Sequence, residues 1–213
     1  SLTIKLHQTL SELYKKKKPD LVIVQGDTTS AMVAALEAFY HKIPIAHVEA
    51  GLRTNDIYQP FPEEVNRRII TQIAKYNFSP TFDSTNAVIT QSHKHSYIYK
   101  VGQTGIDTLL EVEKDIIVEK KSKILVTLHR RENYDKFDKI LDKISYFLSF
   151  NPEWEVVMPV HPAVKKIIEA LDPPFKLIEP LGYFDMIREM KESSIIITDS
   201  GGIQEEATAL RIP

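Results

Sequence analysis

Apolar and polar positions alternate in blocks along the chain, and the blocks predict strands followed by helices. A short apolar run at residues 21–24 ends in a polar turn at 26–29, and apolar positions at helical spacing follow from Met32 to Tyr40. A second run at 45–48 ends in another polar turn. Short apolar runs bounded by turn residues are typical of buried strands, and a spacing of three and four residues is typical of a helix. This stretch therefore predicts two parallel strands joined by a helix.

The second half of the chain repeats this pattern. Strands are predicted at residues 124–127, 156–160, 175–178 and 195–198, with helical spacing at 140–148, 164–171, 184–190 and after 201. Strands that alternate with helices at this spacing indicate parallel βαβ units. We therefore expect an α/β fold of two lobes, residues 1–104 and 105–213, with Gly102 and Gly105 flanking the crossing between them.

Both ends of the chain carry helical patterns where a parallel α/β lobe would have strands. Residues 2–14 show apolar positions at helical spacing, and the last four residues, Leu-Arg-Ile-Pro, resemble the Ile43-Pro44 turn that precedes a strand in the first half. A further helix opens at Pro62, with Val65, Ile69, Ile70 and Ile73 on its expected core face. We expect that strands of both lobes lie outside these 213 residues.

Composition narrows the class of protein. Hydrophobic residues make up 43% of the 213 residues and charged residues 26%, which is typical of a globular protein. The net charge of -2 gives no basic footprint for nucleic acid, and no apolar run approaches the roughly 18 residues of a membrane-spanning helix. The absence of cysteine excludes disulfides and thiolate metal sites. We expect a cytoplasmic enzyme.

Polar residues follow five predicted strands at the point where each strand ends. They are Asp27, Glu49, His129, His161 and the turn at residues 199–202. Ligands of open α/β sheets bind at this edge. Each residue also has a structural explanation, because Asp27 could cap the next helix and Glu49 could pair with Arg53. The two histidines could be satisfied within their turns, but caps have no reason to gather on the ligand edge.

The Ser200-Gly201-Gly202 turn predicts an anion site. Glycines let the backbone approach an anion, and the following helix offers free N–H groups at its start. Glu205 and Glu206 lie in the first turns of this helix, where a carboxylate could accept hydrogen bonds from ribose hydroxyls or simply complement the helix dipole.

A second polar group lies on the helix that opens at Pro62. Glu63, Asn66 and Arg67 are spaced at i, i+3 and i+4, so they share one helix face, and a surface ion pair is the structural alternative. His93 and His95 have no acidic partner at ligand spacing, and we predict no metal site.

Six motifs, in this order along nearly the whole chain, resemble those of the non-hydrolysing UDP-N-acetylglucosamine 2-epimerases. They are GDTTSAMVAALEAFYHKIPIAHVEAGLRT, PFPEEVNRR, FSPT, VTLHRREN, PVHP and TDSGGIQEEA. The resemblance implies two Rossmann-like lobes of the GT-B type with a nucleotide sugar in the cleft between them. It also implies interconversion of UDP-GlcNAc and UDP-ManNAc without a metal or other cofactor. The implied reaction is anti elimination of UDP to a 2-acetamidoglucal, followed by re-addition of UDP with the C2 proton on the opposite face.

The resemblance carries the family's site residues onto this sequence. Asp27, Glu49 and Glu63 match its active-site carboxylates, with their individual roles undecided, and Arg67 lies beside them. His129 matches its essential histidine near the phosphates. The positions that match UDP-binding residues are His161, Ser200, Gly201, Gly202 and Glu206. Between the two acids of the last helix, Glu206 rather than Glu205 is expected to contact the ribose.

The resemblance leaves alternatives open. The family has a first strand with a GTRPE-type loop and a last strand with an arginine-containing loop, and this sequence holds neither. A binding remnant without turnover is therefore one alternative, and a hydrolysing relative that releases UDP and ManNAc is another. A GT-B glycosyltransferase would also bind a UDP-sugar, but the three carboxylates argue against it. A homodimer is expected from the family alone.

Overall fold

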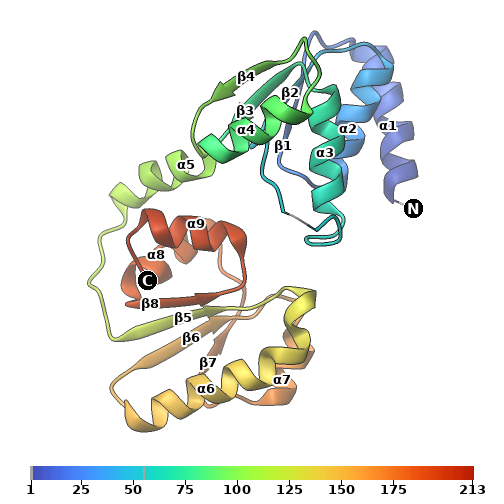
Figure 1. The fold of residues 1–213 in the computed structure, drawn as a ribbon. Coiled ribbons are helices and arrows are strands. Elements are labelled where there is room, and N and C mark those ends of the chain that lie inside the picture. Colours follow the sequence, from blue (N-terminus) through green and yellow to red (C-terminus); the bar gives the residue numbers. More distant parts are fainter. Residues whose placement is uncertain (1, 55) are drawn as a thin grey trace. The chain divides into compact units, whose positions relative to one another are not determined.

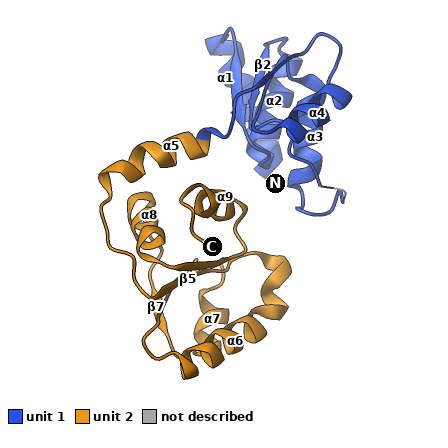
Figure 2. Ribbon diagram, turned by 60° about the vertical axis from the view of Figure 1, so that its left-hand side comes forward, with its two compact units in different colours: residues 1–104 blue, residues 105–213 orange. Residues whose placement is uncertain are grey.

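The computed structural model describes residues 2–54 and 56–213. The chain forms two compact units, residues 1–104 and 105–213, each built on a four-stranded parallel sheet (Figures 1 and 2). The predicted parallel α/β fold is therefore confirmed. Within the described residues, no helix is long and apolar enough to cross a membrane.

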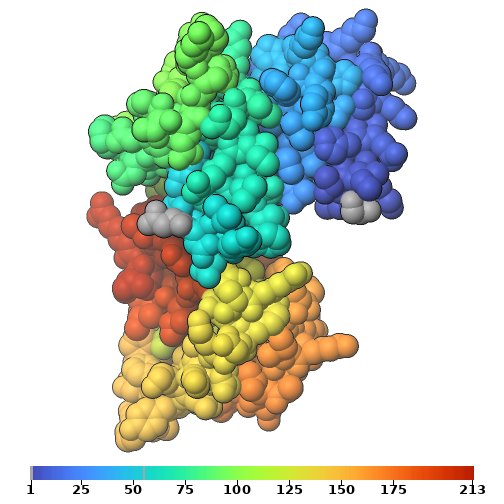
Figure 3. Space-filling model, turned by 45° about the vertical axis from the view of Figure 1, so that its right-hand side comes forward, coloured from blue at the N-terminus to red at the C-terminus, as the bar shows by residue number. Residues whose placement is uncertain are grey.

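Unit 1 alternates helices and strands from its first described residue. Its elements are α1 (Leu2–Lys17), β1 (Val22–Gln25), α2 (Thr29–Tyr40), β2 (Ile45–Val48), α3 (Glu63–Ile73), β3 (Tyr76–Ser79), α4 (Phe82–Gln91) and β4 (Tyr97–Lys100). The strands lie in the order β1-β2-β3-β4, and each pairs in parallel with the next. The helix predicted at the start of the chain is confirmed as α1, which packs against α2 (Figure 3).

One face of the unit 1 sheet carries the apolar core. Val22 and Val24 of β1 are 9% and 5% exposed and pack with residues of α2 and α3, whereas Ile23 between them is 66% exposed. Side chains along β1 thus alternate between buried and exposed, and the described residues cover one face of this strand. The apolar composition of residues 21–24 suggests a strand that is buried on both faces.

Unit 2 begins with α5 (Thr104–Val112), which starts at the boundary between the units. Its other elements are β5 (Lys123–Thr127), α6 (Phe137–Phe150), β6 (Glu155–Pro159), α7 (Lys165–Leu171), β7 (Lys176–Ile178), α8 (Tyr183–Glu192), β8 (Ile195–Thr198) and α9 (Gly201–Ala209). Short 3₁₀ segments at Glu113–Asp115 and Arg131–Lys136 precede β5 and α6. The strand order is β7-β6-β5-β8.

The unit 2 sheet is buried on both faces. The ribbon shows α6 and α7 on one side of the sheet and α8 and α9 on the other (Figure 1). Ile124 and Val126 of β5 belong to the core with α6 and α7, whereas Leu125 packs with Met190 of α8 and Ala207 of α9. The chain runs from β5 to β7 in one direction and then returns to place β8 on the other side of β5. The carboxyl ends of β5 and β8 therefore flank a topological switch point, where open α/β sheets bind ligands.

Gly51 supplies the first testable prediction. Its φ is +92°, and a Cβ there would lie 2.1 Å from the main-chain oxygen of Ser84. Both the left-handed backbone and the clash oppose any side chain, so we expect Gly51→Ala to lower the free energy of unfolding by about 3 kcal/mol in denaturant titrations. Gly105→Ala is the matched control, since a Cβ at Gly105 meets no atom within 4 Å. Equal stability of the two variants would contradict this packing.

Candidate functional site

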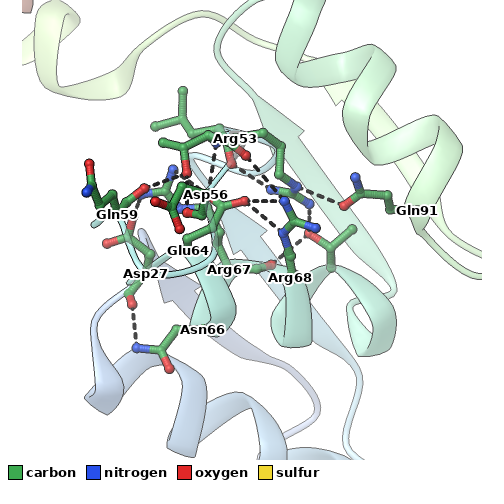
Figure 4. Close-up of polar contacts among 12 residues, drawn as sticks. Asp27, Arg53, Asp56, Gln59, Glu64, Asn66, Arg67, Arg68 and Gln91 are labelled. Atoms are coloured by element: carbon green, nitrogen blue, oxygen red, sulfur yellow. Dashed lines mark hydrogen bonds and ion pairs between the residues drawn. The ribbon is translucent and has the colours of Figure 1, made fainter. Parts of the chain in front are cut away.

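Asp27 follows β1 and is held by two residues of α3. The guanidinium of Arg67 donates to Oδ2 of Asp27, and the side-chain amide of Asn66 donates to the Asp27 main-chain oxygen at 2.9 Å (Figure 4). The cap of α2 is Thr28, whose Oγ1 accepts from the Ala31 N–H at 3.2 Å. Asp27 is therefore not the helix cap, and the Arg67 guanidinium holds its carboxylate in place.

The inward face of α3 is polar near the ends of β1 and β2. Asn66 and Arg67 are 4% and 9% exposed, whereas Val65 is 37% exposed. The prediction that Val65 belongs to the core face is wrong, although Ile70 further along α3 is fully buried. The physical reason is the neighbourhood of Asp27, whose charge and main-chain oxygen need polar partners on that face.

Glu64 is fully buried and connects α3 to the preceding loop. Its Oε2 accepts from the Thr54 N–H at 3.1 Å, and its Oε1 pairs with the Arg68 guanidinium at 2.7 Å. Arg67 Nη1 lies 3.5 Å from Oε2 (Figure 4). Glu63, the residue selected from the sequence, lies beside Glu64 in the first turn of α3 and is partly exposed. The sequence did contain a sign of the structural role of Glu64, because Arg67 and Arg68 follow it at i+3 and i+4, where side chains on a helix can pair.

Glu49 follows β2 in a strained conformation. Its φ is +66°, a value that residues other than glycine rarely adopt. A Cβ built on Gly26 would lie 3.8 Å from Oε2 of Glu49, so the Glu49 carboxylate lies beside the turn that carries Asp27. Since Gln25 of β1 pairs with Val48 of β2, the two acids leave neighbouring strands at the same level of the sheet.

His47 is a buried histidine that the sequence did not single out. Its side chain is 0% exposed, and Nε2 donates to the main-chain oxygen of Gly26 at 2.8 Å. Burial lowers its pKa from 6.5 to about 4, so the ring is neutral at physiological pH. His47 thus fixes the main chain immediately before Asp27.

The buried neutral His47 predicts a pH dependence of stability. Between pH 6.5 and about 4 the unfolded chain binds a proton at this residue that the folded chain does not, so stability falls as pH falls through this window. The pKa difference corresponds to about 3 kcal/mol. We expect the wild type to lose about that much more unfolding free energy between pH 7 and pH 4 than His47→Gln, which has no titrating group. Parallel pH curves for the two proteins would contradict a buried neutral ring.

His129 and His161 follow β5 and β6 at the corresponding edge of the unit 2 sheet. Their ring centroids are 5.7 Å apart. Nδ1 of His161 accepts from the Ala163 N–H at 3.2 Å. The turn therefore supplies a hydrogen bond to one ring nitrogen of this exposed histidine, which fits the structural alternative given for it above. Nδ1 of His129 lies 3.2 Å from Oδ1 of Asp199, and the His129 side chain is 39% exposed.

The turn at residues 200–202 begins α9, as predicted. Ser200 is the cap, and its Oγ accepts from the Ile203 N–H at 3.5 Å. A Cβ on Gly202 would meet no protein atom within 4 Å, so open space lies beside the first turn of the helix. A Cβ on Gly201 would lie 3.5 Å from Nη2 of Arg130. A guanidinium and a helix N-terminus thus both present positive charge at this turn.

Glu206 is the more buried of the two acids in α9. It is partly buried while Glu205 is exposed, and desolvation raises the Glu206 pKa, with a smaller contribution from the Glu205 charge. Burial likewise raises the pKa of Tyr183 in α8, with a further contribution from Glu206. Glu206 therefore lies in a less hydrated position, where a hydrogen-bond donor from a ligand would stabilise its charge.

A cavity of about 250 Å³ opens at the carboxyl edge of the unit 2 sheet. Its lining is mostly apolar and comes from the strand ends and from α8 and α9. The lining residues are Thr127, Leu128, His129, Pro159, His161, Pro180, Leu181, Met186 and Ile203. Apolar walls with a few polar groups are typical of small-molecule sites. The structure thus brings together Asp27, Glu49 and Arg67 in unit 1, and His129, His161 and the start of α9 in unit 2.

Known proteins are similar to this chain over its whole length. A family model described as UDP-N-acetylglucosamine 2-epimerase matches residues 1–213. A curated UDP-N-acetylglucosamine 2-epimerase of Campylobacter jejuni is 40% identical, and the alignment covers 100% of this chain and 62% of the relative. The chain spans about 60% of the length of its curated relatives.

Two solved structures resemble the whole chain. The UDP co-structure of S. aureus MnaA is 36% identical with a TM-score of 0.90, covering 100% of this chain and 61% of that one. The Neisseria meningitidis UDP-GlcNAc 2-epimerase bound to UDP-GlcNAc is 38% identical with a TM-score of 0.89, covering 99% of this chain and 62% of that one. These similarities confirm the predicted two-lobed GT-B class.

Proposed function

Because this chain belongs to the UDP-N-acetylglucosamine 2-epimerase family, we propose that its residues perform the non-hydrolysing reaction, in which UDP-GlcNAc and UDP-ManNAc interconvert at C2. The observation that carries the proposal is the distribution of charge over the two sheet edges. Carboxylates gather after β1 and β2, and groups suited to an anion gather after β5 and β8. Elimination of a diphosphate from a sugar needs both kinds of group.

Unit 2 binds the UDP moiety in this proposal. The first N–H groups of α9 at Gly201 and Gly202 hold the diphosphate, where the helix dipole favours negative charge. The uracil ring enters the apolar cavity beside His161. Glu206 accepts hydrogen bonds from the ribose, which offsets the desolvation of its carboxylate. The relatives whose structures hold UDP or UDP-GlcNAc support this choice of ligand.

Unit 1 supplies the proton transfers. One carboxylate among Asp27, Glu49 and Glu63 removes the proton from C2, the C–H electron pair forms the C1–C2 double bond, and the C1–oxygen bond to UDP breaks. The reverse addition of UDP to the 2-acetamidoglucal delivers a proton to the opposite face of C2, for which a second carboxyl group is available. Arg67 donates to the Asp27 carboxylate and holds it at the end of β1. His129 stabilises charge on the departing phosphate.

Product analysis by ¹H NMR tests this proposal. The 213-residue chain is incubated with UDP-GlcNAc beside the full-length Campylobacter jejuni relative as a positive control. We expect anomeric signals of UDP-ManNAc to appear while the total UDP-sugar stays constant. Free ManNAc with an equal amount of UDP would identify the hydrolysing reaction instead. Binding of UDP without either product would identify a non-catalytic UDP-sugar-binding chain.

Self-association is part of the proposal and has a separate test. The family resemblance predicts a homodimer, so light scattering of the purified chain is expected to give twice the mass of 24.4 kDa. A monomer mass at assay concentration would contradict the dimer without affecting the assignment of the reaction.

A further inference from the structure

Asp199 connects the ends of β5 and β8 through one buried carboxylate. The main-chain N–H groups of His129 and Arg130 donate to it, with nearest distances of 3.0 Å each. The Asn133 side-chain amide donates at 3.3 Å, and Nδ1 of the His129 ring lies 3.2 Å from Oδ1. The Asp199 side chain is only 8% exposed. Its main-chain N–H in turn donates to the Thr127 oxygen at 3.2 Å, so the residue is anchored in the sheet.

We propose that Asp199 is a positioning residue for His129. Its carboxylate accepts the hydrogen on Nδ1 and thereby fixes both the tautomer and the orientation of the ring, so that Nε2 is the nitrogen offered to the UDP moiety. The same carboxylate holds residues 129 and 130 against the start of α9, where the diphosphate is proposed to bind. The expected effect of Asp199 on UDP binding rests on the proposed function of unit 2.

The chemistry of the acceptor determines the tautomer. An ionised carboxylate has no hydrogen to donate, so a ring nitrogen bonded to it carries the hydrogen itself. The neutral ring then has its lone pair on Nε2 and can accept from a ligand hydroxyl, and the protonated ring can donate from Nε2 to a phosphate oxygen. Without Asp199, the ring is free to turn and to take the Nε2–H form.

A purely structural role for Asp199 has a different signature. If the carboxylate serves only to satisfy the N–H groups of the turn, its removal lowers stability but leaves the His129 tautomer unchanged. Thr198 provides the comparison, since its Oγ1 bonds to Thr127 Oγ1 at 2.6 Å and accepts from the Ser200 N–H at 2.9 Å. Thr198→Val therefore weakens the same turn without removing the contact to the His129 ring.

The first test is ligand-free NMR of the 213-residue chain with ¹⁵N-labelled histidine. At pH 8.5, above the ordinary histidine pKa of about 6.5, long-range ¹H–¹⁵N spectra distinguish the two neutral tautomers. The His129 signals are assigned by their loss in His129→Gln. We expect Nδ1–H in the wild type and in Thr198→Val, and Nε2–H in Asp199→Ala. An Nε2–H ring in the wild type would overturn the proposal even if Asp199→Ala does not fold.

The second test is calorimetric titration with UDP. We expect Asp199→Ala to weaken UDP binding by roughly tenfold or more, since a hydrogen bond to a charged group is lost. Asp185→Asn is the matched control, because this α8 carboxylate is 63% exposed and pairs only loosely with Arg188 at 3.9 Å. UDP affinity of a folded Asp199→Ala within twofold of wild type would overturn the positioning role. A wild type that does not bind UDP would instead contradict the proposed function, and the tautomer result would stand on its own.

Discussion

Asp27→Asn is expected to lower the rate of C2 proton exchange by roughly 10²- to 10⁴-fold, the range that a lost general acid or base produces. Asparagine has nearly the same shape and can still accept from Arg67 through its amide oxygen, so the turn after β1 should persist. What is lost is the basic carboxylate. The measurement is the initial rate of solvent exchange at C2 of UDP-GlcNAc at saturating substrate.

Asp20→Asn is the matched control for this variant. Asp20 is exposed and lies two residues before the start of β1, so its substitution removes the same charge near the opposite end of that strand without touching the carboxyl edge. We expect wild-type exchange from Asp20→Asn. Wild-type exchange from Asp27→Asn would remove Asp27 from the proton transfers and leave them to Glu49 and Glu63.

The second large effect is on stability. Replacing Glu64 with glutamine removes the fully buried charge that pairs with both Arg67 and Arg68 and leaves Arg67 only its pair with Asp27, and we expect the free energy of unfolding to fall by about 3 to 5 kcal/mol. The side chain of Arg67 is 10% exposed, so water reaches its guanidinium poorly and cannot take the place of Glu64, whereas Arg68 at 40% is partly hydrated. Denaturant titrations at neutral pH measure the loss.

The neighbouring Glu63 should give the opposite result. Glu63→Gln removes a partly exposed carboxylate from the same helical turn, so we expect its unfolding free energy to match the wild type within about 0.5 kcal/mol. Its C2 exchange should nevertheless decrease, because Glu63 is one of the proposed acid or base groups. If Glu63→Gln destabilised the protein as much as Glu64→Gln, the division of roles between the two adjacent glutamates would be wrong.

The hydrophobic periodicity predicted the strands whose buried side chains are apolar. It missed β3, whose buried side chains are polar. The strands β1, β5, β6 and β8 end where the sequence placed them, within a residue or two. The sequence interpretation assigned no strand to β3, because its inward residues Asn77 and Ser79 are polar and fully buried. Its other face carries Tyr76 and Phe78, stacked on tyrosines of β4, so the pattern lacks an apolar run.

The sequence predicted those residues of the candidate site that directly follow the carboxyl ends of strands. Asp27, Glu49 and His129 lie where parallel strands must bring them, so the topology alone selects them. His47 acts through the main-chain oxygen of Gly26, a contact that a sequence does not display. The sequence placed Asp199 in the candidate turn but could not show that it binds the N–H groups of His129 and Arg130. Whether Glu63 or Glu64 is buried depends on the rotation of α3 about its axis. The apolar positions of α3 did not predict this rotation, because its inward face near the sheet edge is polar.

Deuterium incorporation at C2 shows whether exchangeable carboxyl groups transfer the C2 proton. The 213-residue chain is incubated with UDP-GlcNAc in deuterated water, and the recovered nucleotide sugars are examined by NMR and mass spectrometry. We expect one deuterium at C2 in UDP-ManNAc and, as the reverse reaction proceeds, in recovered UDP-GlcNAc, with the sugar still attached to UDP. UDP-ManNAc that forms with its original C2 hydrogen retained would contradict proton abstraction by solvent-exchanging carboxylates.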